Sequence, residues 1–204
     1  EYLRGKKCYG GLDLSTTTDL TALALLFPPQ AGLESWVVLF WAWRPEDGTL
    51  EAEQRDHVPY RDWARAGFLE LCPGDMVDFS MVEETVAAVA EAFQLDTLGV
   101  APMERLIPVI EVPQDMKNLS PAMKEAERLI RAHQMLHEHN TCARWNFGNV
   151  RCYADINENI RPHKQRSIGR IDTTVAWIIC VAVALVRQGA SDINEHILSE
   201  DWGI

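Results

Sequence analysis

The 204-residue chain lacks several patterns that would place it in a common class of protein. Its five cysteines form no Cys-x-x-Cys pair, which argues against a zinc ribbon or a disulfide framework and favours a reducing cytoplasm. It has no Gly-x-x-x-x-Gly-Lys-Ser/Thr loop, so we expect that this chain does not itself hydrolyse ATP. The longest apolar run, residues 175–186, is too short to span a bilayer and predicts a buried helix.

The start of the chain lacks two further signals. Residues 1–7 contain no apolar stretch of a secretory signal, and the first residue is not Met. We therefore expect a piece of a longer protein. The length allows one domain, predicted for residues 1–190, followed by an acidic tail at 191–204.

Positive charge is scarce, and its distribution is uneven. A net charge of −11 argues against indiscriminate binding of nucleic acid, because phosphate contacts need a cationic surface. Residues 160–172 nevertheless hold four cations: Arg161, Lys164, Arg166 and Arg170. A local basic strip of this kind is compatible with a polyanionic substrate.

Hydrophobic patterning predicts a mixed α/β fold. Three apolar segments with short links predict an antiparallel meander at residues 8–13, 20–27 and 36–43. Helices and strands then alternate, with helices expected at 49–57, 60–66, 80–93, 120–133 and 171–187 and short strands at 68–72, 97–101, 107–112 and 150–154. Ser80 with Glu83 fits a capping box, and Ser120 before Pro121 fits a helix start. A mixed central sheet flanked by helices is the layout of the ribonuclease-H-like fold.

Asp13 is the first candidate for chemistry. It ends the first predicted strand, which is the central one in that layout, and a hydroxyl-rich turn follows it. A buried carboxylate without a partner is strongly penalised, so Asp13 needs a cation, a proton or a helix terminus.

Asp172 is the natural partner for Asp13. It stands at the predicted start of the long C-terminal helix, where a negative charge alone is worth up to about 1 kcal/mol. Hard divalent cations prefer carboxylate oxygens, and two-metal phosphoryl chemistry needs several converging carboxylates. Sequence spacing does not prove that these two residues meet.

Four segments carry a specific resemblance: GLDLSTTTDLTAL at 11–23, VPY at 58–60, LSPAMKE at 119–125, and Lys164 followed by GRID at 169–172. In this order they resemble the C-terminal nuclease domain of the large subunit of tailed-bacteriophage terminases, over roughly residues 8–187. The resemblance implies a ribonuclease-H-like fold and a two-metal endonuclease using Mg²⁺ or Mn²⁺. It also implies Asp13 and Asp172 as metal ligands and catalytic acids.

The resemblance has one departure. The family places a further Asp at the end of a middle strand, where this chain has Ala101. The segment 102–109 is also shorter than the family's connection. Natural change, engineered replacement and absent residues would each account for this, and each implies impaired cleavage by this chain.

The resemblance also implies partners. These are double-stranded phage DNA, cut from concatemers when packaging begins and ends, an ATPase domain before residue 1, the portal and the terminase small subunit. The location is the host cytoplasm, without a membrane. Lys164 and Arg166 are expected to hold phosphates, with Arg170 next to the metal acid; a solvated loop is the alternative.

The remaining acids and histidines are weaker candidates. Asp19 is expected to brace the first loop or a metal-bound water, whereas Asp78 fits a helix cap and Glu111 a strand end. His133 and His137 lack a third ligand and fit an exposed helix end.

Two other functions stay open. The Gly11–Thr17 turn also resembles the phosphate turn of actin-like sugar kinases, but those enzymes need a second lobe and a second phosphate loop, which this chain lacks. A non-catalytic module that docks to DNA or the portal is favoured by Ala101 and by the acidic composition.

Overall fold

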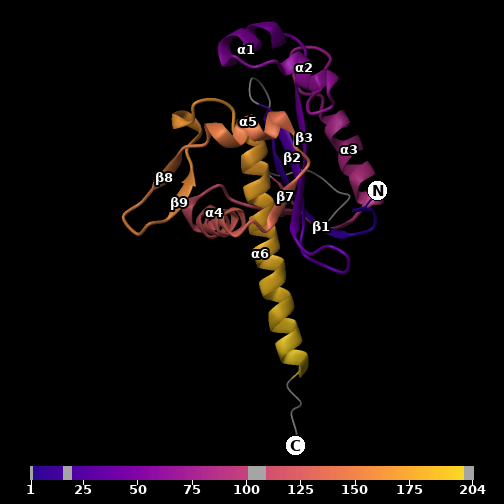
Figure 1. Ribbon diagram of the computed structural model, residues 1–204, viewed down its shortest axis with the longest axis vertical. Helices are drawn as coiled ribbons and strands as arrows, with labels where there is room; N and C mark the ends of the chain where they lie inside the picture. Colours follow the sequence, from indigo (N-terminus) through magenta and orange to yellow (C-terminus); the bar gives the residue numbers. More distant parts are fainter. Residues whose placement is uncertain (1, 16–19, 101–108, 200–204) are drawn as a thin grey trace, which may run out of the picture.

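The computed structural model describes residues 2–15, 20–100 and 109–199, and its main feature is a mixed seven-stranded sheet (Figure 1). The strand order is β4-β3-β2-β1-β5-β6, with β7 paired to β3. The strands are β1 Lys7–Asp13, β2 Thr21–Phe27, β3 Trp36–Pro45, β4 Glu70–Cys72, β5 Gln94–Val100, β6 Val109–Glu111 and β7 Met135–His137. β1, β2 and β3 form the predicted antiparallel meander, and β5 lies parallel to β1.

Helices cover both faces of the sheet. They are α1 Thr49–Asp56, α2 Tyr60–Arg65, α3 Phe79–Ala92, α4 Met116–Arg131, α5 Thr141–Asn149 and α6 Asp172–Ser199. A small hairpin of β8 Cys152–Ala154 and β9 Ile160–Pro162 leads into a 3₁₀ turn, η1 Lys164–Arg166. The predicted mixed sheet with flanking helices is confirmed.

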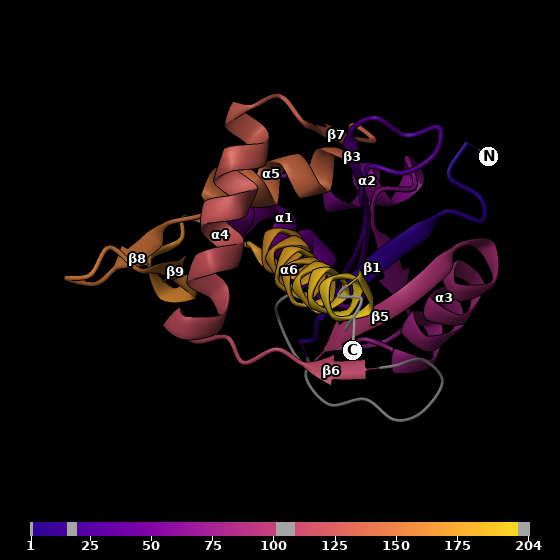
Figure 2. The ribbon, with the colours of Figure 1, turned by 90° about the horizontal axis from the view of Figure 1, so that it is seen from below.

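Alternating side chains divide the core between the two faces. Leu12, Leu23 and Leu25 pack with the apolar side of α3, whereas Ala24 and Leu26 pack with α4 and α6. This follows from the two-residue period of a strand, which sends successive side chains to opposite faces. Figure 2 shows α3 on one side of β1 and β5, and α6 and α4 on the other.

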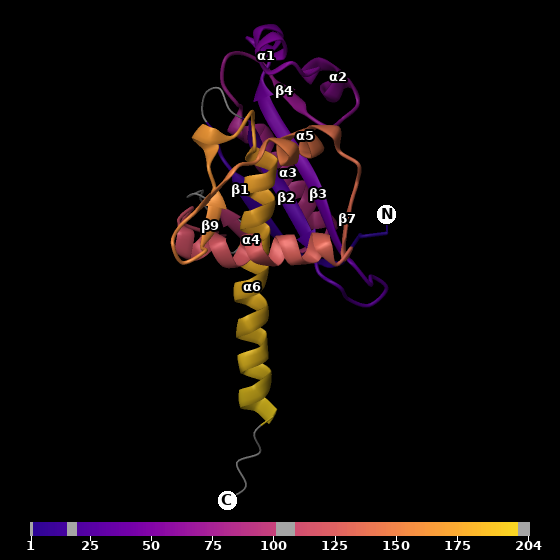
Figure 3. The same cartoon turned by 60° about the vertical axis from the view of Figure 1, so that its left-hand side comes forward.

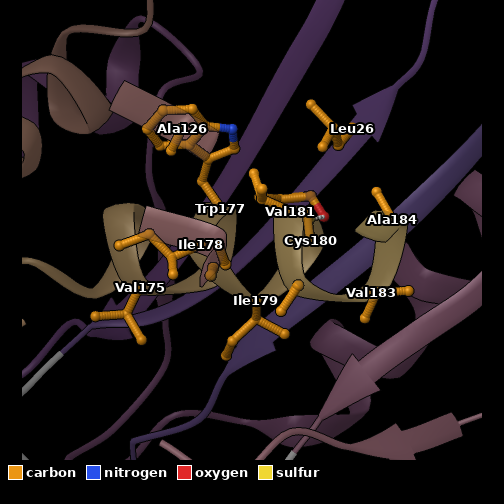
Figure 4. Close-up of a cluster of buried hydrophobic side chains, with 14 of the residues drawn as sticks. Leu26, Ala126, Val175, Trp177, Ile178, Ile179, Cys180, Val181, Val183 and Ala184 are labelled. Carbon is orange, nitrogen blue, oxygen red and sulfur yellow. Dashed lines mark hydrogen bonds between the residues drawn. The ribbon is translucent and has the colours of Figure 1, made fainter. Parts of the chain in front are cut away.

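Two glycines let α6 lie directly on the central strands. A Cβ on Gly11 would come within 2.2 Å of the Ala176 carbonyl oxygen, and one on Gly99 within 2.7 Å of both Ile179 and Val183. Ile179 and Val183 project from the opposite side of α6 to Trp177 (Figure 4). This close packing fixes the first turn of α6 beside the end of β1.

The predicted buried helix is longer than expected. Residues 172–189 of α6 are long and apolar enough to cross a membrane by length and composition, but 72% of this window is buried within the protein. Such burial is typical of a core helix. The helix continues to Ser199, into the segment that we predicted as an acidic tail.

An Asp caps each of two helices near a Ser that also fits a helix start. The predicted cap of α3 by Asp78 is confirmed, because its carboxylate accepts a hydrogen bond from the Ser80 amide, and the helix begins at Phe79, one residue before the predicted start. Asp115 caps α4 by accepting from the amide of Asn118, so Pro121 lies inside that helix. In each case an Asp upstream supplied the cap first.

Several short elements were not predicted from the sequence. They are β7, α5, β9 and η1. The three-residue strands have little periodicity of their own, and their partners lie far away in the sequence. β7, for example, pairs with the start of β3.

Candidate metal and DNA-cleavage site

The end of β1 and the start of α6 bring two carboxylates together. Asp13 is 4% exposed and Asp172 is 2% exposed, although they stand near opposite ends of the sequence. The Lys164 ammonium lies between them, with Nζ 2.8 Å from Oδ2 of Asp13 and 3.6 Å from Oδ1 of Asp172. The fold thus supplies the convergence that sequence spacing alone could not prove.

Neighbouring groups hold both carboxylates in place. The Gln114 side-chain amide donates to Oδ1 of Asp13 at 3.2 Å. The Leu20 backbone amide donates to Oδ2 of Asp172 at 3.4 Å, which ties the start of α6 to the residue before β2. Gln114 carried no signal in the sequence, because an isolated Gln after a short strand fits a loop equally well.

The electrostatics of the site show an excess of negative charge. Burial raises the pKa of Asp172 to about 6; the nearby Asp13 charge adds to the rise and Lys164 opposes it. Burial would lower the pKa of Lys164, but the two carboxylates outweigh it and hold that pKa above its usual value. Lys164, and more weakly the Arg170 guanidinium, oppose the rise at Asp172, but the pKa of Asp172 stays raised, so a further cation would be favourable.

The family follows from comparison of the whole chain with known proteins. Residues 1–188 match the model for the endonuclease domain of the terminase large subunit. The chain therefore belongs to this family. The resemblance seen in the four sequence segments is confirmed.

The terminase domain is also similar to two individual proteins over nearly its whole length. It is 29% identical to the terminase large subunit of Enterobacteria phage HK97, over 94% of this chain and 40% of that protein. It is 27% identical to protein YmfN of Escherichia coli K12, over all of this chain and 48% of that protein. The chain thus spans less than half the length of these relatives.

Solved structures agree on the fold. The HK97 large terminase superposes with a TM-score of 0.81 at 28% identity, over 89% of this chain and 40% of that one. The large terminase nuclease of thermophilic phage G20c, crystallised with bound magnesium, gives a TM-score of 0.52 at 9% identity, over 86% and 80% of the two chains. The second likeness concerns the fold alone.

The basic strip of the terminase domain divides between the site and its surroundings. Lys164 lies against the acids, whereas Arg166 is exposed on the same turn. The Arg170 guanidinium lies 3.9 Å from Asp56, at the end of α1. Asp56 also accepts from the Tyr60 hydroxyl at 2.7 Å, so α1 and α2 are anchored beside the start of α6. Phosphate binding by these cations stays a prediction.

Two of the predicted site residues, Ala101 and Asp19, lie outside the described residues. Glu111 ends β6, opposite Val100 of β5. Within the described ranges, no group of three His, Cys, Asp or Glu residues is placed to hold a metal ion. The described part of the chain therefore provides two converging carboxylates, Asp13 and Asp172, as candidate metal ligands.

His133 is exposed just after the end of α4, and His137 and His139 lie near the start of β3, on the side away from β2. His137 belongs to β7, which pairs with Trp36–Val38, and the ring of His139 lies 5.1 Å from that of His137. The His139 amide donates to Nδ1 of His137. Among the described residues they belong to no group of three or more side chains placed to hold a metal ion.

Proposed function

We propose that this terminase domain is the metal-dependent endonuclease of a viral DNA-packaging motor, cutting concatemeric double-stranded phage DNA when packaging begins and ends. The observation that supports the proposal is the convergence of two buried carboxylates, Asp13 and Asp172, on a single ammonium group. Burying two like charges close together lowers the stability of the folded protein. Such destabilising pairs are typical of active sites.

The donor set fits a hard divalent cation. Both ligands offer carboxylate oxygens, which Mg²⁺ and Mn²⁺ prefer. The raised pKa of Asp172 indicates that Lys164 does not fully compensate the burial of this carboxylate and the charge of Asp13. Asp13 would hold the ion from β1 and Asp172 from α6. Bound there, the metal would activate water and stabilise the departing 3′ oxygen. The bound magnesium of the G20c nuclease belongs to that protein, and it motivates the choice of ion.

Lys164 has two roles in this proposal. In the metal-free domain its ammonium partly offsets the charge of the acids, as the 2.8 Å contact to Asp13 indicates. Its side chain is 43% exposed, so it can also reach a DNA phosphate at the mouth of the site. Arg166 and Arg170 extend the positive charge along the same strip and would hold the flanking phosphates.

We further propose that Ala101 limits cleavage by this chain. The described register places Leu12 opposite Val100, so the end of β5 reaches the level at which β1 delivers Asp13. An acid directly after Val100 would be a third ligand in the family pattern. Its replacement by Ala leaves weaker metal binding and slower cutting.

The test is nicking of supercoiled plasmid DNA with Mn²⁺. Ala101→Asp should raise the nicking rate, and Asp13→Asn or Asp172→Asn should abolish any cutting. Asp62→Asn is the matched control, because that exposed acid pairs only with Arg65 on the surface of α2 among the described residues. Cutting that survives both Asn variants would refute the assignment of the two acids.

Calorimetric titration with Mn²⁺ separates this function from a docking module. The nuclease proposal requires Mn²⁺ binding that disappears in Asp13→Asn. Absence of such binding in both the parent chain and Ala101→Asp would leave docking to DNA or the portal as the better reading. The ATPase domain, the portal and the small subunit are the further partners that we propose, in the host cytoplasm.

A further inference from the structure

A second recess lies apart from the two acids. It is a pocket of about 450 Å³ between β3, β7, α5 and the first turns of α6, which we name the α5 pocket. Its lining includes Phe40, Met135, Phe147 and Trp177, and it shares no residue with the Asp13–Lys164–Asp172 site. The proposed DNA-cleavage reaction does not involve this pocket.

The rim of the α5 pocket is apolar and accessible. Ile130, Leu136 and Phe147 line it and are 40–53% exposed. Large apolar side chains that gather around one opening commonly mark a docking surface, whereas isolated ones do not. The α5 pocket therefore has both a hydrophobic floor and a hydrophobic entrance.

Two polar atoms at the α5 pocket have no partner within the described part of the chain. Trp177 is 5% exposed and its indole Nε1 makes no hydrogen bond; the same holds for the hydroxyl of Thr174, one turn earlier. Both residues line the pocket. Buried donors without acceptors are rare in native proteins, and a backbone carbonyl entering the pocket would satisfy them.

The charge around the pocket selects the kind of occupant. Its titratable lining residues are His133, His137 and Arg144, and none of the described lining residues is Asp or Glu. This is unusual for a chain of net charge −11. The nearby Glu138 carboxylate is already engaged by the Phe40 amide at 2.7 Å. A fitting occupant is an apolar side chain flanked by carboxylates.

The C-terminal residues of this chain have that composition. They read Glu200-Asp201-Trp202-Gly203-Ile204, which is two acids followed by an aromatic and an aliphatic side chain. Trp202 would suit the aromatic and aliphatic walls of the pocket. The two acids would then lie beside Arg144 and the histidines.

The length of α6 decides which copy supplies this segment. Ser199 lies 22 residues beyond Trp177 on one helix, a rise of about 33 Å at 1.5 Å per residue. Figures 1 and 3 show α6 running out past the other elements. Five extended residues span at most about 17 Å, too little to return to the pocket. The segment must come from another molecule.

We infer that the α5 pocket binds residues 200–204 of a second copy of this chain. In this contact Trp202 enters the pocket, and the two acids of the segment lie beside Arg144 and the histidines. The projecting part of α6 carries the segment away from its own copy. Each contact joins two different surfaces, the pocket of one copy and the segment of another. Two copies can exchange segments to close a symmetric dimer, or successive copies can build larger assemblies.

Sedimentation velocity over a range of protein concentrations, in metal-free buffer, tests the inference. The full chain should self-associate, and a chain ending at Ser199 should stay monomeric with an unchanged melting temperature. Arg144→Glu and Phe147→Ser should each weaken association by at least about tenfold, as expected for a central contact. Met76→Ser, at an exposed residue outside the pocket, is the control.

A charge exchange makes the test specific. Glu200→Lys with Asp201→Lys should abolish association, and mixing that variant with Arg144→Glu should restore it. A fluorescent peptide of residues 194–204 should bind the truncated chain and not its Phe147→Ser form. The inference is overturned if the full chain is monomeric throughout, if truncation leaves association unchanged, or if the peptide does not bind. Nuclease activity enters none of these readouts, so the failure of either proposal is distinguishable.

Discussion

At the scale of single residues, Asp172 illustrates the cost in stability of a buried carboxylate at the proposed site. Its carboxylate is almost fully buried, and both burial and Asp13 raise its pKa to about 6. Compared with an ordinary value near 3.8, this corresponds to roughly 3 kcal/mol of unfavourable ionisation in the folded state. The folded pKa lies above the unfolded one. The free energy of unfolding should therefore fall as the pH rises from about 4 through 6.

Asp172→Asn should stabilise the metal-free domain at pH 8 by about 1–3 kcal/mol, because the amide removes a buried charge of similar shape. The gain should shrink as the pH falls through 6 and vanish only below about pH 4, where the carboxylate is protonated in the unfolded chain as well. Urea unfolding of both proteins at pH 4.5 and 8 measures this. Equal stability at pH 8, with Asp62→Asn as the reference, would show that Lys164 already balances the charge.

Lys164→Met should have the opposite effect in the absence of metal. The ammonium is the compensating cation nearest to Asp13, so its loss leaves two buried acids facing each other, at a cost of about 1–3 kcal/mol. Mn²⁺ should then raise the melting temperature of this variant more than that of the parent, since the ion no longer competes with Lys164. Lys124→Met, an exposed lysine on α4, is the control. Identical Mn²⁺ responses in all three proteins would contradict a shared place for lysine and metal.

At the scale of elements, the sequence predicted the parts that depend on local pattern. β1, β2 and β3 follow from apolar runs between clear turns, and α3 from its apolar face. The start of α4 was missed because Ser120 before Pro121 suggested a later start than Asp115, which caps the helix. Asp13 and Asp172 could be proposed as metal ligands from the sequence, because each carboxylate stands at the predicted end of a strand or start of a helix. The position of Lys164 between the two acids could not be predicted from the sequence. It depends on the path of the β8–β9 hairpin, whose three-residue strands are held by contacts with residues far away in the sequence.

Gly11→Ala tests the direct packing of α6 on β1. The new Cβ would meet backbone atoms, the Ala176 carbonyl oxygen at 2.2 Å and the Cys180 nitrogen at 2.7 Å, so the helix must move. We expect a loss of about 3 kcal/mol or more in the free energy of unfolding. Gly148→Ala on α5 is the control. Nothing lies within 4 Å of its added Cβ, and it should stabilise the domain by about 0.5–1 kcal/mol. A loss at Gly11 no larger than about 1 kcal/mol would mean that α6 is free to shift.

At the scale of the whole molecule, the fold makes one site from the two ends of the sequence. β1 supplies Asp13 and α6 supplies Asp172, and the Lys164 ammonium lies between the two carboxylates. The Leu20 amide, just before β2, donates to the Asp172 carboxylate. An ion held by both acids would therefore bind only when β1 and α6 are folded together. Metal binding and folding of these two elements should be thermodynamically linked.

Hydrogen exchange with and without Mn²⁺ tests this linkage. At about 100 times the dissociation constant, binding contributes about 2.7 kcal/mol, which should slow exchange about 100-fold for amides that exchange only when β1 and α6 come apart. Peptides from β1 and from the first turns of α6 should slow together, whereas the hairpin tip between β8 and β9, which opens locally, should not change. Asp13→Asn should remove the effect at both elements at once. Slowing confined to α6 would instead mean that Asp172 holds the ion without Asp13, and the two ends of the chain would then be joined by packing alone.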